Sequence, residues 1–260
     1  MKLYLPFLVG AILTTGSFAH QIHGILLVNG TESPEWKYVR DVAWMEGYTP
    51  ENYPEPDSEF PKTPPQQDIN HPDITCGRSA FDAAAKTETA DVLAGSEVGF
   101  RVSWDGNGKY GVFWHPGPGQ IYLSRAPNDE LETYRGDGDW FKIAYGGPSG
   151  NNTWSLWGAH DFNFTIPKTT PPGKYLMRIE QFMPTPWSNY TQWYVNCAHV
   201  NIIGPGGGTP TGFAKFPGTY VVDDPGLKIP ENQFVNGGYV PDDEMRALDY
   251  QTPGPAVWSD

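Results

Sequence analysis

The chain is poor in basic residues and in cysteine. Lysine and arginine number 17 against 30 aspartates and glutamates, so the formal net charge is −13 at pH 7. Such an acidic surface repels phosphate groups, and we therefore expect no nucleic-acid or membrane partner, whereas a neutral polysaccharide is not excluded. The only cysteines are Cys76 and Cys197. Two cysteines leave no room for a cysteine-rich carbohydrate-binding module, and in a secreted chain we expect them to form a disulfide.

Long hydrophobic runs are also missing, apart from one at the N-terminus. Lys2 precedes an apolar run over residues 3–13, which is too short for a membrane span. Small residues follow at Ser17 and Ala19, the positions that a signal peptidase reads. We therefore predict that residues 1–19 are a signal peptide and that the protein is secreted to the extracellular space. Glycosylation sequons begin at Asn29, Asn151, Asn163 and Asn189, in agreement with secretion.

Helical periodicity is almost absent, and short alternating segments take its place. Val98, Phe100, Val102 and Trp104 alternate with polar or small residues. Further strands are expected over residues 24–28, 120–125, 140–145, 161–166, 174–182 and 192–203, with one short helix within 77–90. This pattern predicts an all-β fold, an antiparallel immunoglobulin/fibronectin-like β-sandwich. Residues 20–260 would form a single catalytic domain, with long loops and a loop-rich C-terminal wrap from about residue 205.

Two histidines have the setting of metal ligands. Cleavage after Ala19 would leave His20 with a free α-amine, and that amine and the ring Nδ1 can chelate one ion. His115 lies between Trp114 and Pro116-Gly-Pro118, which force an exposed loop. Two imidazoles and an amine favour Cu(II) over Zn(II). The alternatives are that His20 merely flanks the cleavage site and that His115 is a surface histidine without a role.

A third candidate group lies late in the chain, at Gln192-Trp193-Tyr194. Because side chains alternate along a strand, Gln192 and Tyr194 share one face and Trp193 points to the other. Tyr194 could then occupy an axial position of the metal, and Gln192 could donate a hydrogen bond to the reacting oxygen. The alternative is that both are ordinary residues of the sandwich.

A series of segments recurs in a fixed order along the chain: His20 with residues 28–30, then 73–77, 115–118, 136–143, 171–175, 178–180, 192–197, 216–220, 224–226 and 253–258. Each segment is weakly specific by itself, but their joint order is specific. Together, they resemble the fungal lytic polysaccharide monooxygenases of auxiliary activity family nine.

The resemblance implies a fold, a cofactor and a reaction. One copper ion would be held by the amine and Nδ1 of His20 and by Nε2 of His115, with Tyr194 axial. A small-molecule or protein electron donor would reduce the copper, O₂ or H₂O₂ would be activated, and β-1,4-glucan chains such as cellulose would be cleaved at C1 and/or C4. The protein would act as a monomer.

The chain departs from the family pattern at one place. Family members carry a histidine after the Arg-x-Glu segment, but no histidine lies between Glu180 and Gln192 here. Thr185 or Gln181 could stand in for it. This departure motivates an alternative from another class, a non-catalytic secreted copper- or polysaccharide-binding protein. A zinc hydrolase is disfavoured because no glutamate lies near the histidines in sequence.

Substrate contact must come from the catalytic face if no binding module is present. The aromatic residues proposed for it are Trp36, Tyr38, Trp44, Tyr48 and Tyr220. Packing within the loops is the alternative role for these residues.

Overall fold

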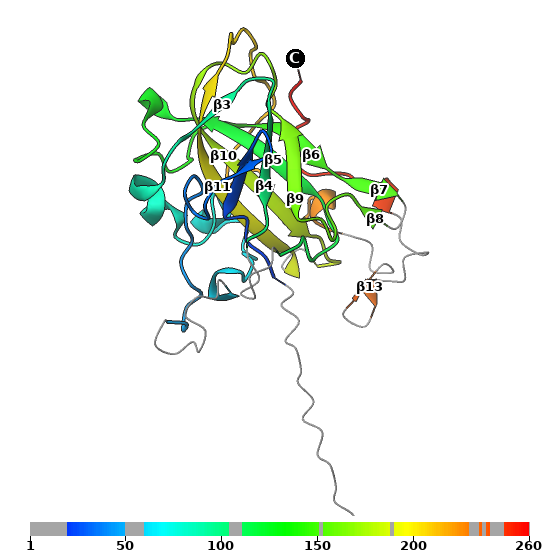
Figure 1. Ribbon diagram of the computed structural model, residues 1–260. Coiled ribbons are helices and arrows are strands. Elements are labelled where there is room, and N and C mark those ends of the chain that lie inside the picture. Colours follow the sequence, from blue (N-terminus) through cyan, green and yellow to red (C-terminus); the bar gives the residue numbers. More distant parts are fainter. Residues whose placement is uncertain are drawn as a thin grey trace, which may run out of the picture.

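The computed structural model describes residues 20–49, 60–103, 111–150, 153–187, 190–228, 234–235, 238–239 and 247–259. Two β-sheets lie face to face (Figure 1). The smaller sheet has the order β2 (Thr31–Glu32), β1 (Ile25–Val28), β4 (Glu97–Arg101), β9 (Asp161–Thr165). The larger sheet has the order β12 (Phe213–Ala214), β6 (Trp140–Gly146), β5 (Gly119–Arg125), β10 (Gly173–Met183), β11 (Gln192–Ile203), β3 (Ala90–Leu93). The predicted β-sandwich is confirmed.

Smaller elements decorate this frame. The described residues contain two further two-stranded ribbons, β7 (Pro148–Gly150) with β8 (Thr153–Trp154) and β13 (Phe234–Val235) with β14 (Gly238–Tyr239). Their helices are short 3₁₀ turns: η1 (Phe60–Lys62), η2 (Pro72–Ile74), η3 (Ala80–Lys86), η4 (Pro127–Asp129), η6 (Pro225–Leu227) and η9 (Ala247–Asp249). The helix expected within 77–90 is η3. Among the described residues, no helix is long and apolar enough to cross a membrane.

Strand pairing departs from the prediction at one edge of the larger sheet. β3 runs parallel to β11, with Ala90 opposite Val200, so the sheet is mixed rather than wholly antiparallel. A tight hairpin joins β1 to β2. Asn29 and Gly30 both have positive φ, 50° and 73°, which is the conformation that a two-residue hairpin turn requires.

Two hydrophobic cores lie on the two faces of the larger sheet. Alternate residues of β10 separate them: Met177 and Ile179 join the core between the sheets, whereas Leu176 and Phe182 join the core beneath the loops. Both faces of β10 and β11 are therefore buried, and their buried polar residues, Arg178 and Glu180 among them, need polar partners.

The C-terminal segment packs onto the sandwich. Trp258 belongs to the core between the sheets, and its backbone N–H donates to the carbonyl oxygen of Lys142 at 2.8 Å. The buried Nζ of Lys142 donates to the carbonyl oxygen of Pro253 at 3.0 Å. Two backbone carbonyls and one buried side chain thus hold this segment against β6.

The predicted disulfide between Cys76 and Cys197 is present, with an S–S distance of 1.97 Å. It joins the segment after η2 to the middle of β11 and closes a loop with a sequence separation of 121 residues. Both cysteines lie in the core beneath the loops.

Candidate metal centre

Three side chains from separate parts of the chain meet at one end of the sandwich. His20 precedes β1, His115 lies in the connection before β5, and Tyr194 is the third residue of β11. The ring centres of His20 and His115 are 6.2 Å apart. The Tyr194 ring centre lies 6.3 Å from that of His20 and 5.7 Å from that of His115. The structure therefore brings together the three residues that the sequence proposed as metal ligands.

Backbone hydrogen bonds fix the N-terminal segment that carries His20. The His23 N–H donates to Oδ1 of Asn196 on β11 at 2.9 Å, and the Gly24 N–H donates to Oγ of Ser103 at 3.0 Å. The His23 ring is fully buried and stacks on Phe113 with ring centres 5.1 Å apart. Burial lowers the pKa of His23 to about 3, so this ring stays neutral and serves packing.

The loop that carries His115 is held tightly against β10. Gly117 has φ +149°, and a Cβ atom there would lie 2.0 Å from the carbonyl oxygen of Phe182. Only glycine fits this approach. The Pro-Gly-Pro sequence therefore holds the loop that carries His115 against β10.

The spacing of the three rings fits a single metal ion. Metal–nitrogen bonds of about 2 Å on opposite sides of an ion place two imidazole centres roughly 6 Å apart, close to the 6.2 Å found here. The described residues contain no cluster of three or more His, Cys, Asp or Glu that could hold a metal. A site with two imidazoles therefore needs a further donor, and the α-amine of a mature His20 would supply it.

The protonation states of the three groups suit this role. Burial lowers the pKa of His20, which favours the neutral, ligating imidazole. Burial also raises the pKa of Tyr194 well above its usual value, so the phenol stays protonated. The Tyr194 hydroxyl donates to Oε1 of Gln192 at 2.7 Å. Gln192 is thus oriented by Tyr194, and its NH₂ group is the end left to donate.

Neither proposed substitute for the missing histidine presents a side chain at the surface. Gln181 is completely buried, and its Nε2 donates to the carbonyl oxygen of His115 at 3.1 Å. Thr185 is 2% exposed, and its Oγ1 donates to the carbonyl oxygen of Trp187 at 2.6 Å. Both side chains thus donate to backbone carbonyl oxygens, and the suggestion that either replaces the histidine stays a prediction.

One of the five aromatic residues proposed for substrate contact is buried. Tyr220 is 3% exposed and stacks on Trp193, with ring centres 4.8 Å apart, so its assignment was wrong. Tyr38 packs on the sandwich core, and its carbonyl oxygen accepts from the His199 N–H, far along β11 from Tyr194. Trp36 packs against both cores. Tyr38 and Trp36 are half-buried, so their assignments stay predictions.

Trp44 and Tyr48 are half-buried residues of the loop over 41–49. They remain predicted contacts.

Sequence reasoning missed three exposed aromatic residues close to the triangle. Trp114 precedes His115 and is 41% exposed. Trp187 and Tyr190 are 49% and 58% exposed, with ring centres 6.2 Å apart, and they lie in the connection from β10 to β11. That connection ends at Gln192. The signal was a pair of aromatic residues directly before the Gln192 strand.

The predicted modification sites are partly within the described chain. Asn29 and Asn163 are exposed, as glycosylation requires. Asn151, Asn189 and Trp104, together with the predicted signal peptide over 1–19, lie outside the described residues.

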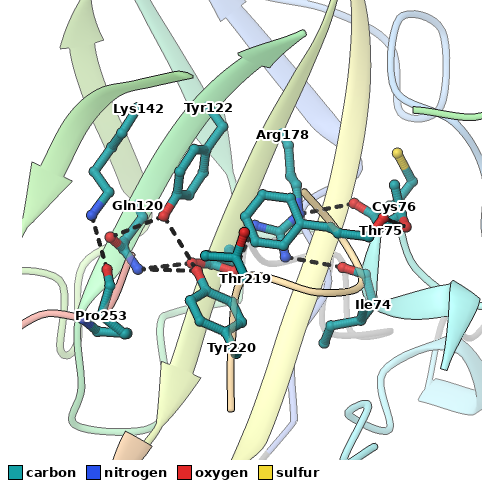
Figure 2. A network of polar contacts seen from close by, with 12 residues as sticks. Ile74, Thr75, Cys76, Gln120, Tyr122, Lys142, Arg178, Thr219, Tyr220 and Pro253 are labelled. Atoms are coloured by element: carbon teal, nitrogen blue, oxygen red, sulfur yellow. Dashed lines mark hydrogen bonds and ion pairs between the residues drawn. The ribbon is translucent and has the colours of Figure 1, made fainter. Parts of the chain in front are cut away.

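A buried polar network extends from β10 to β5 and to the disulfide segment (Figure 2). Arg178 Nη1 contacts Glu180 Oε2 at 2.5 Å, and both side chains are fully buried. Gln120 donates to the same carboxylate at 2.8 Å, and the Tyr220 hydroxyl also donates to it. Arg178 further donates to the carbonyl oxygens of two residues beside Cys76. The network thus joins β10 to the disulfide segment, and it gives the Arg-x-Glu sequence a structural role.

Fold and site define a class of protein: a β-sandwich that brings two histidines and a tyrosine together at one end. The model of Auxiliary Activity family 9 (formerly GH61) matches residues 20–237. The chain belongs to this family, and it is a lytic polysaccharide monooxygenase. Members of the family are copper enzymes, and the donor set described here agrees with copper.

Curated relatives and solved structures agree with this assignment. The chain is 76% identical over the full length of both chains to "AA9 family lytic polysaccharide monooxygenase U" of Thermothielavioides terrestris. It is 34% identical to monooxygenase D of Aspergillus tamarii, over 93% of this chain and 81% of that one. A structure titled as a cellulose-active polysaccharide monooxygenase from M. thermophila has the same fold, with a TM-score of 0.63 and 20% identity over 92% of this chain and 99% of that one.

Proposed function

We propose that this protein is a secreted enzyme that cleaves β-1,4-glucan chains, cellulose first among them, by oxidation at C1 and/or C4. The reaction would consume O₂ with two electrons and two protons from an external reductant, or H₂O₂. One oxygen atom is inserted into a C–H bond and the other leaves as water. The hydroxylated carbon then expels its glycosidic oxygen, which breaks the chain. The observation that carries the proposal is the triangle of His20, His115 and Tyr194.

The residues that would hold the copper follow from this triangle. The α-amine and Nδ1 of His20 and Nε2 of His115 would supply three nitrogens, and the Tyr194 side chain would lie beside them. Copper supplies one-electron redox chemistry and activation of the oxidant when it is bound. The family match begins at residue 20, which supports His20 as the first residue of the mature enzyme.

The neighbouring residues would control what happens beside the metal. Tyr194 keeps its proton because of burial, so it acts as a weak neutral donor rather than as a phenolate. It holds the amide oxygen of Gln192, and the Gln192 NH₂ can then donate to the reacting oxygen. Such a contact, made in the activated state, lowers the barrier more than it strengthens substrate binding.

The exposed aromatic residues supply a surface for sugar rings. Trp114, Trp187 and Tyr190 project from the two connections that flank the triangle. Pyranose rings present apolar C–H faces that pack on aromatic rings, and the net charge of −13 does not oppose a neutral glucan. Cellulose is the substrate to test first because a neighbour with this fold is titled cellulose-active.

The test is release of oxidised oligosaccharides from amorphous cellulose by the copper-loaded chain that begins at His20, with ascorbate as reductant. Mass spectrometry should detect aldonic acids, 4-ketosugars or both. Gln192→Ala should bind copper nearly as well as wild type and release far less product, whereas Tyr194→Phe should have a milder effect and an altered copper spectrum.

Absence of oxidised product from wild type on every β-glucan tried would contradict the proposed activity and favour a passive copper-binding role. Equal, non-zero release by wild type and Gln192→Ala would contradict the role assigned to Gln192.

A further inference from the structure

We propose that Gln21 and Gln181 form an amide clamp, a pair of positioning residues that fixes the separation of His20 and His115 and thereby sets copper affinity. The inference rests on the proposed function, since it takes His20 and His115 as the copper ligands. It concerns side chains that do not touch the metal.

A continuous chain of hydrogen bonds defines the clamp. The Trp114 N–H donates to Oε1 of Gln21 at 2.7 Å. Nε2 of Gln21 donates to Oε1 of Gln181 at 2.9 Å. Nε2 of Gln181 then donates to the carbonyl oxygen of His115 at 3.1 Å. The residue that follows His20 is thus joined to backbone groups on both sides of the Trp114–His115 peptide bond.

Both clamp residues are inaccessible to solvent, at 2% exposure for Gln21 and 0% for Gln181. The neighbours of Gln181 on the inner face of β10, Met177 and Ile179, belong to the apolar core. A primary amide in such a place costs about 1–3 kcal/mol if its hydrogen bonds are unmade. Each of these amides has both its oxygen and its nitrogen engaged, so the burial is compensated.

The chemistry of the chain requires an amide at both positions. Each residue must accept one hydrogen bond and donate another, and an ionised carboxylate only accepts. A glutamate at position 181 would set an acceptor against the carbonyl oxygen of His115. An apolar side chain of the same length would leave the Trp114 N–H or the His115 carbonyl without this partner.

The clamp also adjoins the third member of the triangle. Gln181 and Tyr194 are register partners on β10 and β11, so their side chains leave the same face of the sheet. Gln181 is therefore linked to His20 through Gln21, to His115 through its carbonyl, and to Tyr194 through the strand pairing. The backbone bonds of His23 and Gly24 hold this segment further along the chain, and the clamp extends the hold to the residue next to His20. Ordering that end only on metal binding would cost affinity.

The experiment compares Cu(II) affinity, by competition titration, and the Cu(II) electron paramagnetic resonance spectrum in chains that begin at His20. The variants are Gln21→Met, Gln181→Met and the double variant, with Gln120→Met as a matched control. Gln120 is a completely buried glutamine of β5 that bonds Glu180 and no residue of the triangle. Loss of a clamp residue should weaken copper binding by about 10–100-fold and alter the spectrum. The double variant should bind copper no more weakly than whichever single variant has the lower affinity, because either change breaks the same chain of bonds.

Copper affinity within twofold of wild type and an unchanged spectrum in both single variants would overturn the clamp. An equal loss in Gln120→Met would also overturn it, because the effect would then reflect general destabilisation. If Gln181→Met does not fold, Gln21→Met decides the matter alone. Failure of the proposed function has a different signature, which is wild-type protein that binds no copper or releases no oxidised sugar.

Discussion

Neutralising Glu180 is expected to destabilise the protein strongly, because the residue is buried beside a charged partner. The Glu180 side chain is fully buried, and it balances the fully buried Arg178 guanidinium at 2.5 Å. Glu180→Gln keeps the shape but leaves Arg178 charged without its carboxylate. Removing one member of a buried ion pair costs about 3–5 kcal/mol. At 2–4 °C per kcal/mol for a domain of this size, the melting temperature should fall by roughly 6–20 °C.

The assay is urea denaturation followed by tryptophan fluorescence, with the disulfide intact. Arg178→Met/Glu180→Met replaces the pair by apolar side chains of similar volume and should lose less than Glu180→Gln alone, because no buried charge is left unpaired. A loss below about 1 kcal/mol in Glu180→Gln, or a double variant that loses the sum of the two single changes, would refute this reasoning.

Three further outcomes follow from other parts of the structure. Replacing Cys76 and Cys197 by alanine should lower the free energy of unfolding by about 5 kcal/mol on the chain-entropy account of a 121-residue loop, and a loss under 1 kcal/mol in urea denaturation would argue against it. Burial lowers the pKa of His199 to about 3, so the unfolded chain binds an extra proton between that value and its ordinary pKa, and stability falls as the pH drops through this window. Between pH 7 and pH 5, the free energy of unfolding should fall by about 2 kcal/mol more in wild type than in His199→Gln. Equal losses in wild type and variant would contradict the burial argument. Trp187→Ala should weaken retention on cellulose severalfold, and Phe213→Ala, which removes a 55% exposed aromatic ring from β12, should not; equal retention of both variants would remove Trp187 from the binding surface.

The long strands of the sandwich could be predicted because they carry enough residues to show their period. β11 runs from Gln192 to Ile203, as the alternation and the flanking turn residues indicated. β3 could not be predicted in the same way. It has only four residues, Ala90–Leu93, and its parallel partner on β11 lies over a hundred positions away, a pairing that no local pattern reveals.

The proximity of His20 and His115 could be predicted because unusual chemistry marks both residues in the sequence. A histidine after a cleavage site and a histidine in a Pro-Gly loop are rare settings, and His20 and His115 do lie together. Aromatic residues carry no such mark. Tyr220 fills a core beneath the loops and Trp187 is exposed, although both occur in loop-rich sequence. The contact between Gln21 and Gln181 spans 160 positions and has no motif, so only the fold reveals it.

The most direct test of the central claim is Cu(II) titration of two chains, one beginning at His20 and one beginning at Ala19. If His20 provides both its α-amine and its ring, the first chain binds one tightly held copper ion. The second chain lacks the amine at that position and should lose most of its affinity. Equal affinity in the two chains, or no stoichiometric binding by the first, would contradict a copper site built on the mature N-terminus.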